Sequence, residues 1–191
     1  MIKIRDAKIS DAVDLRDIYD HYVKNTAITF EITTPDVTEF ESRMRDIMSR
    51  YPYIVIEEDG RIEGYAYAHA FVGREAYSHS CEMTIYLRAD SRHHGLGRKL
   101  YEAMEEKLRE MGIINLYACI GETDKEDEYL TNNSTEFHAH MGYKKVGTFR
   151  KCGRKFGRWY DMVWMEKLIG EHTDDPAEVK WRDDGDKKTK E

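Results

Sequence analysis

Alternating hydrophobic and polar residues in segment 82–88 give way to a helical pattern a few positions later. Successive side chains of a strand point to opposite sides, so one face of this strand would carry Met83, Ile85 and Leu87. Between 96 and 111, apolar residues recur every three or four positions, which is typical of a helix with one buried face. Gly112 follows as a helix stop. This part of the chain therefore predicts a strand, a glycine-containing turn and a helix.

Similar patterns continue on both sides of this unit. A turn signal at Glu58, Asp59 and Gly60 separates two β-rich runs and predicts a hairpin over 51–71. The order β-α-α-β-β-β-α-β-α-β-β predicts an α/β chain of the α+β type. Besides the two arms of the hairpin, we expect strands at 2–5, 82–88, 115–121, 144–152 and 158–168, and helices at 10–24, 38–50, 96–111 and 134–141.

Composition limits the functional classes. A length of 191 residues suits one domain, and a net charge of −7 argues against a general binder of nucleic acid. The polar start MIKIRDAKIS does not match a secretory signal, and no run approaches the roughly 20 apolar residues of a membrane span. Three scattered cysteines fit reduced thiols buried in strands better than a disulfide or zinc site. We expect a cytoplasmic protein with no metal, nucleic-acid or membrane partner.

The composition changes again near the end of the chain. From Gly170 onward, charged residues dominate and apolar periodicity is weak. We therefore expect one domain over 1–169 and a charged, flexible tail over 170–191, with Trp181 as a point of attachment to the body.

The turn RHHGLGRK, at 92–99, combines two glycines with basic side chains. A helix start leaves N–H groups without partners, and these groups favour a bound anion together with the helix dipole. Gly95 and Gly97 would let a ligand approach the backbone. The spacing matches neither the GxxxxGK[ST] of a P-loop nor the GxGxxG of a dinucleotide site, since the third residue after Gly97 is Leu100. What is left is R-x-x-G-x-G directly after a strand.

This pattern resembles the pyrophosphate loop of the GNAT superfamily of acetyl-CoA-dependent N-acetyltransferases. Over about residues 1–169, the chain resembles the phosphinothricin and methionine sulfone or sulfoximine N-acetyltransferases within that superfamily. The segments that carry the likeness are TAITFE, RYP, YAYAHAF, R-x-A-Y from Arg74, Glu82, RHHGLG, ACIG, STEFHAHMGY and KFGRWYD. The resemblance implies the GNAT fold with a mixed central sheet flanked by helices, acetyl-CoA as co-substrate, a small-molecule amine as acceptor, and a homodimer.

Acetyl transfer from a thioester to an amine needs a neutral amine and a proton for the leaving thiolate. Glu82 stands where the resembling enzymes carry a glutamate assigned as the general base. His138 lies four residues after Ser134, in a slot where the phosphinothricin-type enzymes carry a histidine. Its imidazole would protonate the thiolate or share the base role. His69 and His140 lack this support, and we take them as structural.

The resemblance also implies a place for the coenzyme. Backbone groups of Ile85, Tyr86 and Leu87 would bond the pantetheine arm, because in this fold their strand separates from 115–121 and leaves edge groups unpaired. The N–H of Leu87 or of its neighbour would polarise the thioester carbonyl. The residues expected around the phosphates are Arg92, His93, His94, Gly95, Leu96, Gly97, Arg98 and Lys99.

A second group of coenzyme contacts is expected just before and at the start of the last helix. Thr131 takes the position where family members usually place an asparagine that helps to hold the coenzyme, and Asn132 and Asn133 are adjacent. With Ser134, these residues form the expected group, although Thr131 departs from the family pattern. The acidic run ETDKEDEYL, at 122–130, looks like an insertion that could reshape acceptor choice or contact a partner subunit.

Acceptor recognition is expected from one basic and several aromatic side chains. Arg74 could pair with the α-carboxylate of an amino-acid-like acceptor. The aromatic residues expected to line the pocket are Phe30, Tyr77, Phe156 and Trp159.

Two alternatives stay open beside an amino-acid N-acetyltransferase. One is a GNAT acetyltransferase for a polyamine, an aminoglycoside or a protein N-terminus, which the acidic run would suit. The other is a non-catalytic acyl-CoA-binding module, for which Glu82 would be dispensable. Because both Glu82 and His138 are present, we favour an enzyme.

Overall fold

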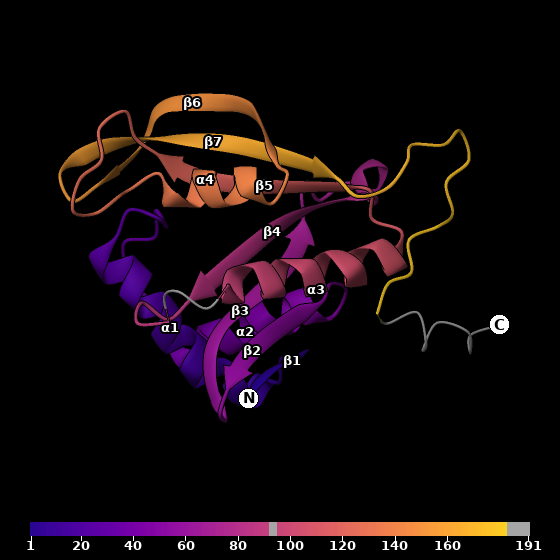
Figure 1. Cartoon of the computed structure of the whole chain (residues 1–191), viewed down its shortest axis with the longest axis horizontal. Coiled ribbons are helices and arrows are strands. Elements are labelled where there is room, and N and C mark those ends of the chain that lie inside the picture. The colour runs from indigo at the N-terminus through magenta and orange to yellow at the C-terminus, as the bar shows by residue number, and fades with distance from the viewer. Residues whose placement is uncertain (92–94, 183–191) are drawn as a thin grey trace.

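A computed structural model describes residues 1–91 and 95–182, and over these residues the strands form one mixed sheet (Figure 1). The strand order is β1-β2-β3-β4-β5-β7-β6, and every neighbouring pair is antiparallel except β4 and β5. The strands are β1 Ile2–Asp6, β2 Tyr53–Glu58, β3 Arg61–Ala70, β4 Ser80–Leu87, β5 Asn115–Glu122, β6 Lys144–Lys155 and β7 Arg158–Leu168. The helices are α1 Ala12–Asn25, α2 Val37–Met48, α3 Leu96–Met111 and α4 Asn133–His140.

The central strands are buried on both faces. In β2, Tyr53 and Val55 pack with α1 and α2, whereas Ile54 and Ile56 pack with α3. Their side chains alternate between the two faces, so the continuous apolar run YIVI supplies two cores at once. Figure 1 shows α3 in front of this half of the sheet and α4 beside β5. The sheet is thus covered by α1 and α2 on one side and by α3 on the other.

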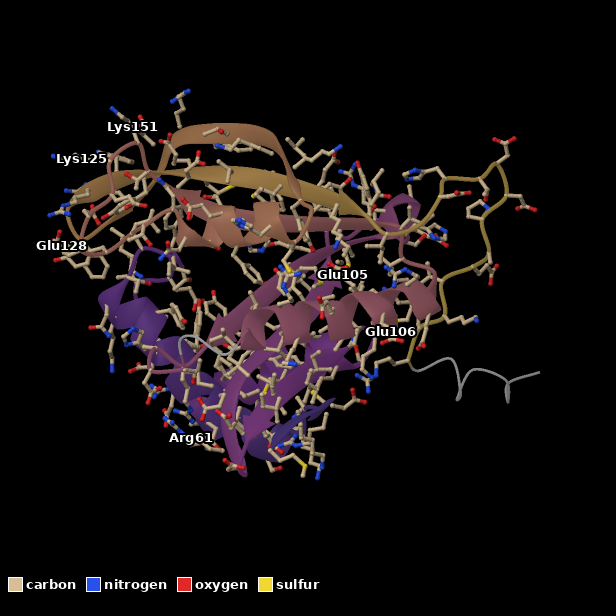
Figure 2. The ribbon with its side chains drawn as sticks, in the orientation of Figure 1. Arg61, Glu105, Glu106, Lys125, Glu128 and Lys151 are labelled. Atoms are coloured by element: carbon tan, nitrogen blue, oxygen red, sulfur yellow. The ribbon has the colours of Figure 1, made fainter. Side chains whose placement is uncertain are left out.

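An ion pair ties α3 to the other half of the sheet. The ammonium of Lys167 on β7 donates to both carboxylate oxygens of Glu105, at 2.8 and 2.7 Å. Glu105 is buried, and Figure 2 shows it between α3 and the β5–β7 strands, while the neighbouring Glu106 is on the outer side. The buried carboxylate is therefore paired, as a charge inside a protein must be.

The sheet opens between β4 and β5. These parallel strands pair only through Ser80–Glu82 with Asn115–Tyr117, and the rest of β4 has no strand partner on that side. Figure 1 shows β4 running away from β5 beyond this point. Glu82 is the last residue of β4 that pairs with β5, so it lies where these two strands separate.

The element order predicted from the sequence is confirmed, with small changes at the ends. The helix expected at 38–50 ends at Met48, β6 continues to Lys155, and a short 3-10 turn, Glu75–Tyr77, was not expected. The expectation of three buried thiols is wrong for two of them, because only Cys81 is buried and Cys119 and Cys152 are exposed.

Strand alternation explains the position of one of these thiols. On β5, Ala118 and Ile120 face the core, so Cys119 points to the other side of the sheet.

Among the described residues, no helix is long and apolar enough to cross a membrane.

The described part of the C-terminal segment, 170–182, lies against the body. Val179 is only 7% exposed and joins the α3 core, and the N–H of Lys180 donates to the carbonyl of Met111. Trp181 packs edge-on against Tyr51 at 5.3 Å between ring centroids. Its ring also carries the Arg50 guanidinium 4.1 Å from its centroid, which is a cation–π contact. The attachment expected at Trp181 is present, and Val179 extends it.

Replacing Trp181 tests this attachment. We expect Trp181→Ala to lower the free energy of unfolding by about 2 kcal/mol, through lost apolar burial and the lost cation–π contact. The measurement is urea-induced unfolding at pH 7. Lys180→Ala is the matched control, since its backbone bond to Met111 stays and its side chain is exposed. An equal effect of both changes would contradict the attachment.

Candidate active site

A cavity of about 320 Å³ lies where β4 and β5 separate. Both predicted catalytic side chains, Glu82 and His138, line it. Phe30, Tyr67, His69, Thr84, Tyr101, Cys119 and Ser134 are among the other lining residues. The cavity therefore brings β3, β4, β5, α3, α4 and the loop after α1 to one place.

Glu82 is a partly buried carboxyl with a histidine beside it. Its side chain is 18% exposed, and its Oε2 lies 3.7 Å from Nε2 of His69 on β3. The two residues face each other directly in the β3–β4 register. Burial raises the pKa of Glu82 above its ordinary value, while the positive charge of a protonated His69 lowers it. A raised pKa brings this carboxylate closer to the acidity of a useful general base.

His138 is almost fully buried, at 3% exposed, and makes two hydrogen bonds. Its Nδ1 lies 2.6 Å from the carbonyl of Ser134, so Nδ1 carries the proton and donates. Its Nε2 lies 2.7 Å from the hydroxyl of Tyr101 on α3, which must then donate to it. Burial lowers the pKa of His138 to about 4.

The neutral state of His138 bears on its predicted role. With this pKa, about one molecule in a thousand would be protonated there at pH 7. An acid must carry its proton, so the geometry favours an accepting role over proton donation. The hydroxyl that reaches the cavity beside it belongs to Tyr101.

The backbone of β4 beyond Glu82 offers groups to a ligand. The N–H of Arg88 donates to the carbonyl of Glu63 on β3. Along an antiparallel strand, every second residue directs its N–H and C=O to the same neighbouring strand. Tyr86 therefore turns its N–H and C=O toward β3, whereas Ile85 and Leu87 turn theirs toward the gap. The carbonyl of Leu87 already accepts from the hydroxyl of Tyr22 at 2.6 Å. Of the three residues predicted to bind the pantetheine arm through their backbone, two have the required orientation.

The glycine turn begins α3 as predicted. Gly95 precedes the helix with φ of 65°, in the left-handed region, which favours glycine there. No described atom lies within 4 Å of where a Cβ would stand, so the backbone is open to a ligand. Arg98 and Lys99 are exposed, and Leu96 and Gly97 are buried beneath the turn. The predicted contacts Arg92, His93 and His94 lie outside the described residues.

The coenzyme contacts predicted just before and at the start of α4 do not all line the cavity. Ser134 lines the cavity, and Thr131 is exposed nearby in sequence. Asn132 instead bonds the acidic run: its amide donates to the carbonyl of Thr123 at 3.1 Å, and its N–H donates to Glu126 at 2.7 Å. Its side chain therefore supports the loop 123–131 in this structure.

Basic side chains neutralise most of the acidic run. Arg158 on β7 pairs with Asp127 at 2.7 Å and with Glu128 at 3.0 Å, and Lys145 pairs with Glu122. Figure 2 shows Glu128 and Lys125 together at the end of the molecule, far from Glu105 on α3. The run is thus a folded connection fixed to β7.

The predicted acceptor residues do not all meet. Phe30 lines the cavity with Glu82. Arg74 and Tyr77 line a second cavity of about 620 Å³, beside Arg50 and Trp181. Trp159 is 58% exposed beside the acidic run, and Phe156 stacks on Tyr129 with 4.2 Å between centroids. Within one chain, only Phe30 of this group shares the cavity with Glu82 and His138.

Sequence reasoning missed several cavity residues. Tyr101 falls within the helix predicted at 96–111 but was not named as a site residue, and Tyr67 and Thr84 were not singled out. His69 was taken as structural, although it faces Glu82 across two paired strands. The hairpin pattern and the alternation of β4 indicated which residues share a face, but the register between the strands was needed to show that His69 lies opposite Glu82.

Among the described residues, no group of three or more His, Cys, Asp or Glu side chains could hold a metal ion.

The buried imidazole of His138 makes stability depend on pH. Its pKa in the folded state is about 4, below the ordinary value of about 6.5, so the unfolded chain binds the proton more readily. Stability is therefore full above pH 6.5 and falls as the pH drops toward 4. We expect roughly 2 kcal/mol of this loss between pH 7 and pH 5. Urea unfolding at both values measures it.

His138→Gln should remove this part of the pH dependence, because an amide does not titrate. His140→Gln, on the exposed side of the same helix, should keep it. The same loss in wild type and His138→Gln would contradict a neutral, buried His138.

Comparisons with known proteins show the family of this chain. The family model described as an acetyltransferase (GNAT) domain matches residues 4–164. A phosphinothricin N-acetyltransferase of Streptomyces coelicolor is 32% identical over 173 residues, covering 88% of this chain and 96% of that protein. An L-methionine sulfoximine/L-methionine sulfone acetyltransferase of Pseudomonas aeruginosa is 30% identical over 168 residues, covering 85% and 92%.

A solved structure has the same architecture. The GNAT phosphinothricin acetyltransferase of Sinorhizobium meliloti, in complex with acetyl-CoA, superposes with a TM-score of 0.85 at 32% identity and covers 93% of this chain and 94% of that one. The fold predicted by the resemblance is confirmed, and acetyl-CoA is the co-substrate. The chain belongs to the GNAT superfamily of N-acetyltransferases.

Proposed function

We propose that this acetyltransferase transfers the acetyl group of acetyl-CoA directly to the amine of a small amino-acid-like acceptor, with Glu82 as the general base. The observation that carries this proposal is the position of Glu82, partly buried at the point where β4 and β5 separate and facing the cavity. Relatives named for phosphinothricin and for methionine sulfoximine or sulfone support the class of acceptor.

The open edge of β4 and the glycine turn fit acetyl-CoA, which supplies the acetyl group as a thioester. In this proposal, Gly95 to Lys99 hold the pyrophosphate through backbone N–H groups and positive charge. Ile85 and Leu87 bond the pantetheine arm, and an N–H of this strand polarises the thioester carbonyl. Ser134 contacts the coenzyme from the start of α4.

The residues of this chain then manage the protons. An amine enters mostly protonated at pH 7, and Glu82 takes that proton so that the nitrogen can attack the thioester carbonyl. The C–N bond forms, the C–S bond breaks, and the second proton of the nitrogen passes to the departing sulfur, which leaves as the thiol of the coenzyme. His138 stays neutral and accepts from Tyr101, which keeps that hydroxyl directed within the cavity. Of the two predicted roles for His138, acid and second base, the low pKa argues against the acid, and the imidazole in this proposal positions the hydroxyl of Tyr101.

The shape and charge of the cavity favour small acceptors over polycations. Phe30 and Tyr67 give it aromatic walls, and its volume of about 320 Å³ suits a small molecule. The carboxylates of the acidic run are mostly paired with Arg158 and Lys145, which leaves less negative charge for a polyamine or an aminoglycoside. Arg74 and Tyr77 are not part of this single-chain acceptor site, because they line the second cavity.

We also propose a homodimer, on the basis of the resemblance and of apolar side chains on β6 and β7. Val146, Phe149 and Trp159 are all more than half exposed on these strands. They lie at separate positions along the β6–β7 edge of the sheet, where another chain would cover them.

Removing the carboxylate tests the proposed base. We expect Glu82→Gln to lower kcat/KM for the acceptor by at least about 100-fold, because the amide cannot take a proton. Thiol release from acetyl-CoA would be followed with phosphinothricin, methionine sulfone, methionine sulfoximine, the ordinary amino acids, spermidine and an aminoglycoside.

Coenzyme binding by Glu82→Gln, measured by calorimetry, should be unchanged. Glu166→Gln on β7, whose carboxylate lies outside the cavity, is the control. Full turnover by Glu82→Gln would exclude this residue as the base. Turnover of polycations alone would exclude the amino-acid-like acceptor.

Gly153 offers a test of the acceptor pocket, because a Cβ at this position of β6 would lie 2.3 Å from the ring of Phe30. Gly153→Ala must therefore displace that ring or the strand. We expect the KM for the acceptor to rise about tenfold while the Kd for acetyl-CoA stays the same, since mispositioned site residues weaken binding locally. Gly147→Ala on the same strand is the matched control, with no atom within 4 Å of its added methyl. An unchanged acceptor KM in Gly153→Ala would remove Phe30 from the acceptor site.

A further inference from the structure

His69 contacts the proposed base and also reaches a second space. It lies on β3 directly opposite Glu82, and its side chain is 35% exposed, about twice as much as that of Glu82. It lines the catalytic cavity and also a neighbouring cavity of about 360 Å³ that is bounded by α2 and the tyrosines of β2 and β3. The imidazole therefore lies between Glu82 and the neighbouring cavity and lines both cavities.

The hydrogen bonds of His69 define which nitrogen faces Glu82. Nδ1 lies 3.1 Å from the carbonyl of Ala70, and a carbonyl only accepts, so Nδ1 carries a proton. Nε2 then points toward Oε2 of Glu82 at 3.7 Å. A neutral Nε2 and an ionised carboxylate would place two lone pairs against each other. The arrangement is favourable when one proton is held by the pair, on the carboxyl or on the imidazole.

Other titratable groups surround the pair without replacing either partner. Around Glu82 these are Tyr67, Cys81, Tyr101 and Cys119, whose neutral side chains carry no positive charge. His138 lines the same cavity but is neutral. On the other side of His69, Arg43 and Asp46 line the neighbouring cavity, and the ring of Tyr67 lies 5.9 Å away. Arg43 is already paired with Glu31 and Glu39.

We infer that His69 is the proton outlet of the active site, receiving from Glu82 the proton that Glu82 removes from the acceptor amine. This inference rests on the proposed function. An N–H bond of the ammonium breaks as an O–H bond forms on Glu82. The pair starts with its one proton on Nε2 of His69, and the imidazolium gives that proton to water. The O–H bond on Glu82 then breaks as an N–H bond forms again on Nε2, across a separation that shortens from 3.7 Å to hydrogen-bond length. No electron transfer is involved, and the carboxylate is restored for the next acceptor.

The pH profile of His69→Gln tests this role. A charged imidazole favours the ionised form of Glu82, so its removal should move the acid limb of kcat/KM to higher pH. We expect kcat/KM to fall severalfold on the acid limb and to stay close to the wild-type value at pH 8.5. His140→Gln, which changes an exposed histidine outside the cavity, should leave the profile unchanged. Thermal unfolding of each variant would confirm that it is folded.

A second measurement does not depend on turnover. The NMR signals of the His69 ring nitrogens at pH 7 should differ between wild type and Glu82→Gln, because the neutral amide no longer attracts a proton to Nε2. An unchanged acid limb in His69→Gln, or unchanged ring-nitrogen signals of His69 in Glu82→Gln, would overturn the inference. If Glu82→Gln were inactive in either case, the proposed base would still stand. If Glu82→Gln kept full activity, the proposed base itself would fail.

Discussion

The separation of β4 from β5 is the constraint on which the site depends. Parallel strands normally continue their pairing, but here the ladder stops at Glu82 opposite Tyr117. Unpaired backbone groups are costly when buried, so β4 beyond this point needs another partner. The same opening forms the cavity and gives the carboxylate of Glu82 access to it. One interruption of the sheet therefore explains why the carboxylate of Glu82 and a strand edge without a strand partner occur together.

Burial controls the protons of this site in a consistent way. It favours the neutral form of every titratable group, which raises the pKa of Glu82 and lowers that of His138. Both shifts reduce the charge in the cavity. His69, on the more exposed side, acts against this trend for Glu82 by offering a positive charge. The site thus combines a partly buried carboxyl group with a neighbouring histidine that is more open to solvent.

Two segments that looked peripheral in the sequence have defined places in the fold. The acidic run between β5 and α4 is fixed to β7 by Arg158, so much of its charge is neutralised within the chain. The described part of the C-terminal segment covers the end of α3 with Val179 and Trp181. Charged composition alone does not separate a solvated stretch from one that places a few apolar residues on the body.

The sequence by itself determined the elements, their order and the glycine turn, because these depend on local patterns. Alternation and helical periodicity follow from the backbone geometry of strands and helices, and so the helix at 96–111 was predicted to its exact bounds. Family likeness in the motifs was enough to select Glu82 and His138 as candidates.

Only the tertiary structure decided which residues meet them. Tyr101 reaches His138 from another helix, and His69 faces Glu82 through the register of β3 and β4. Arg74 lies in a different cavity from Glu82 although the two are close in sequence. Such contacts depend on strand register and helix packing across the whole chain, which no local pattern encodes.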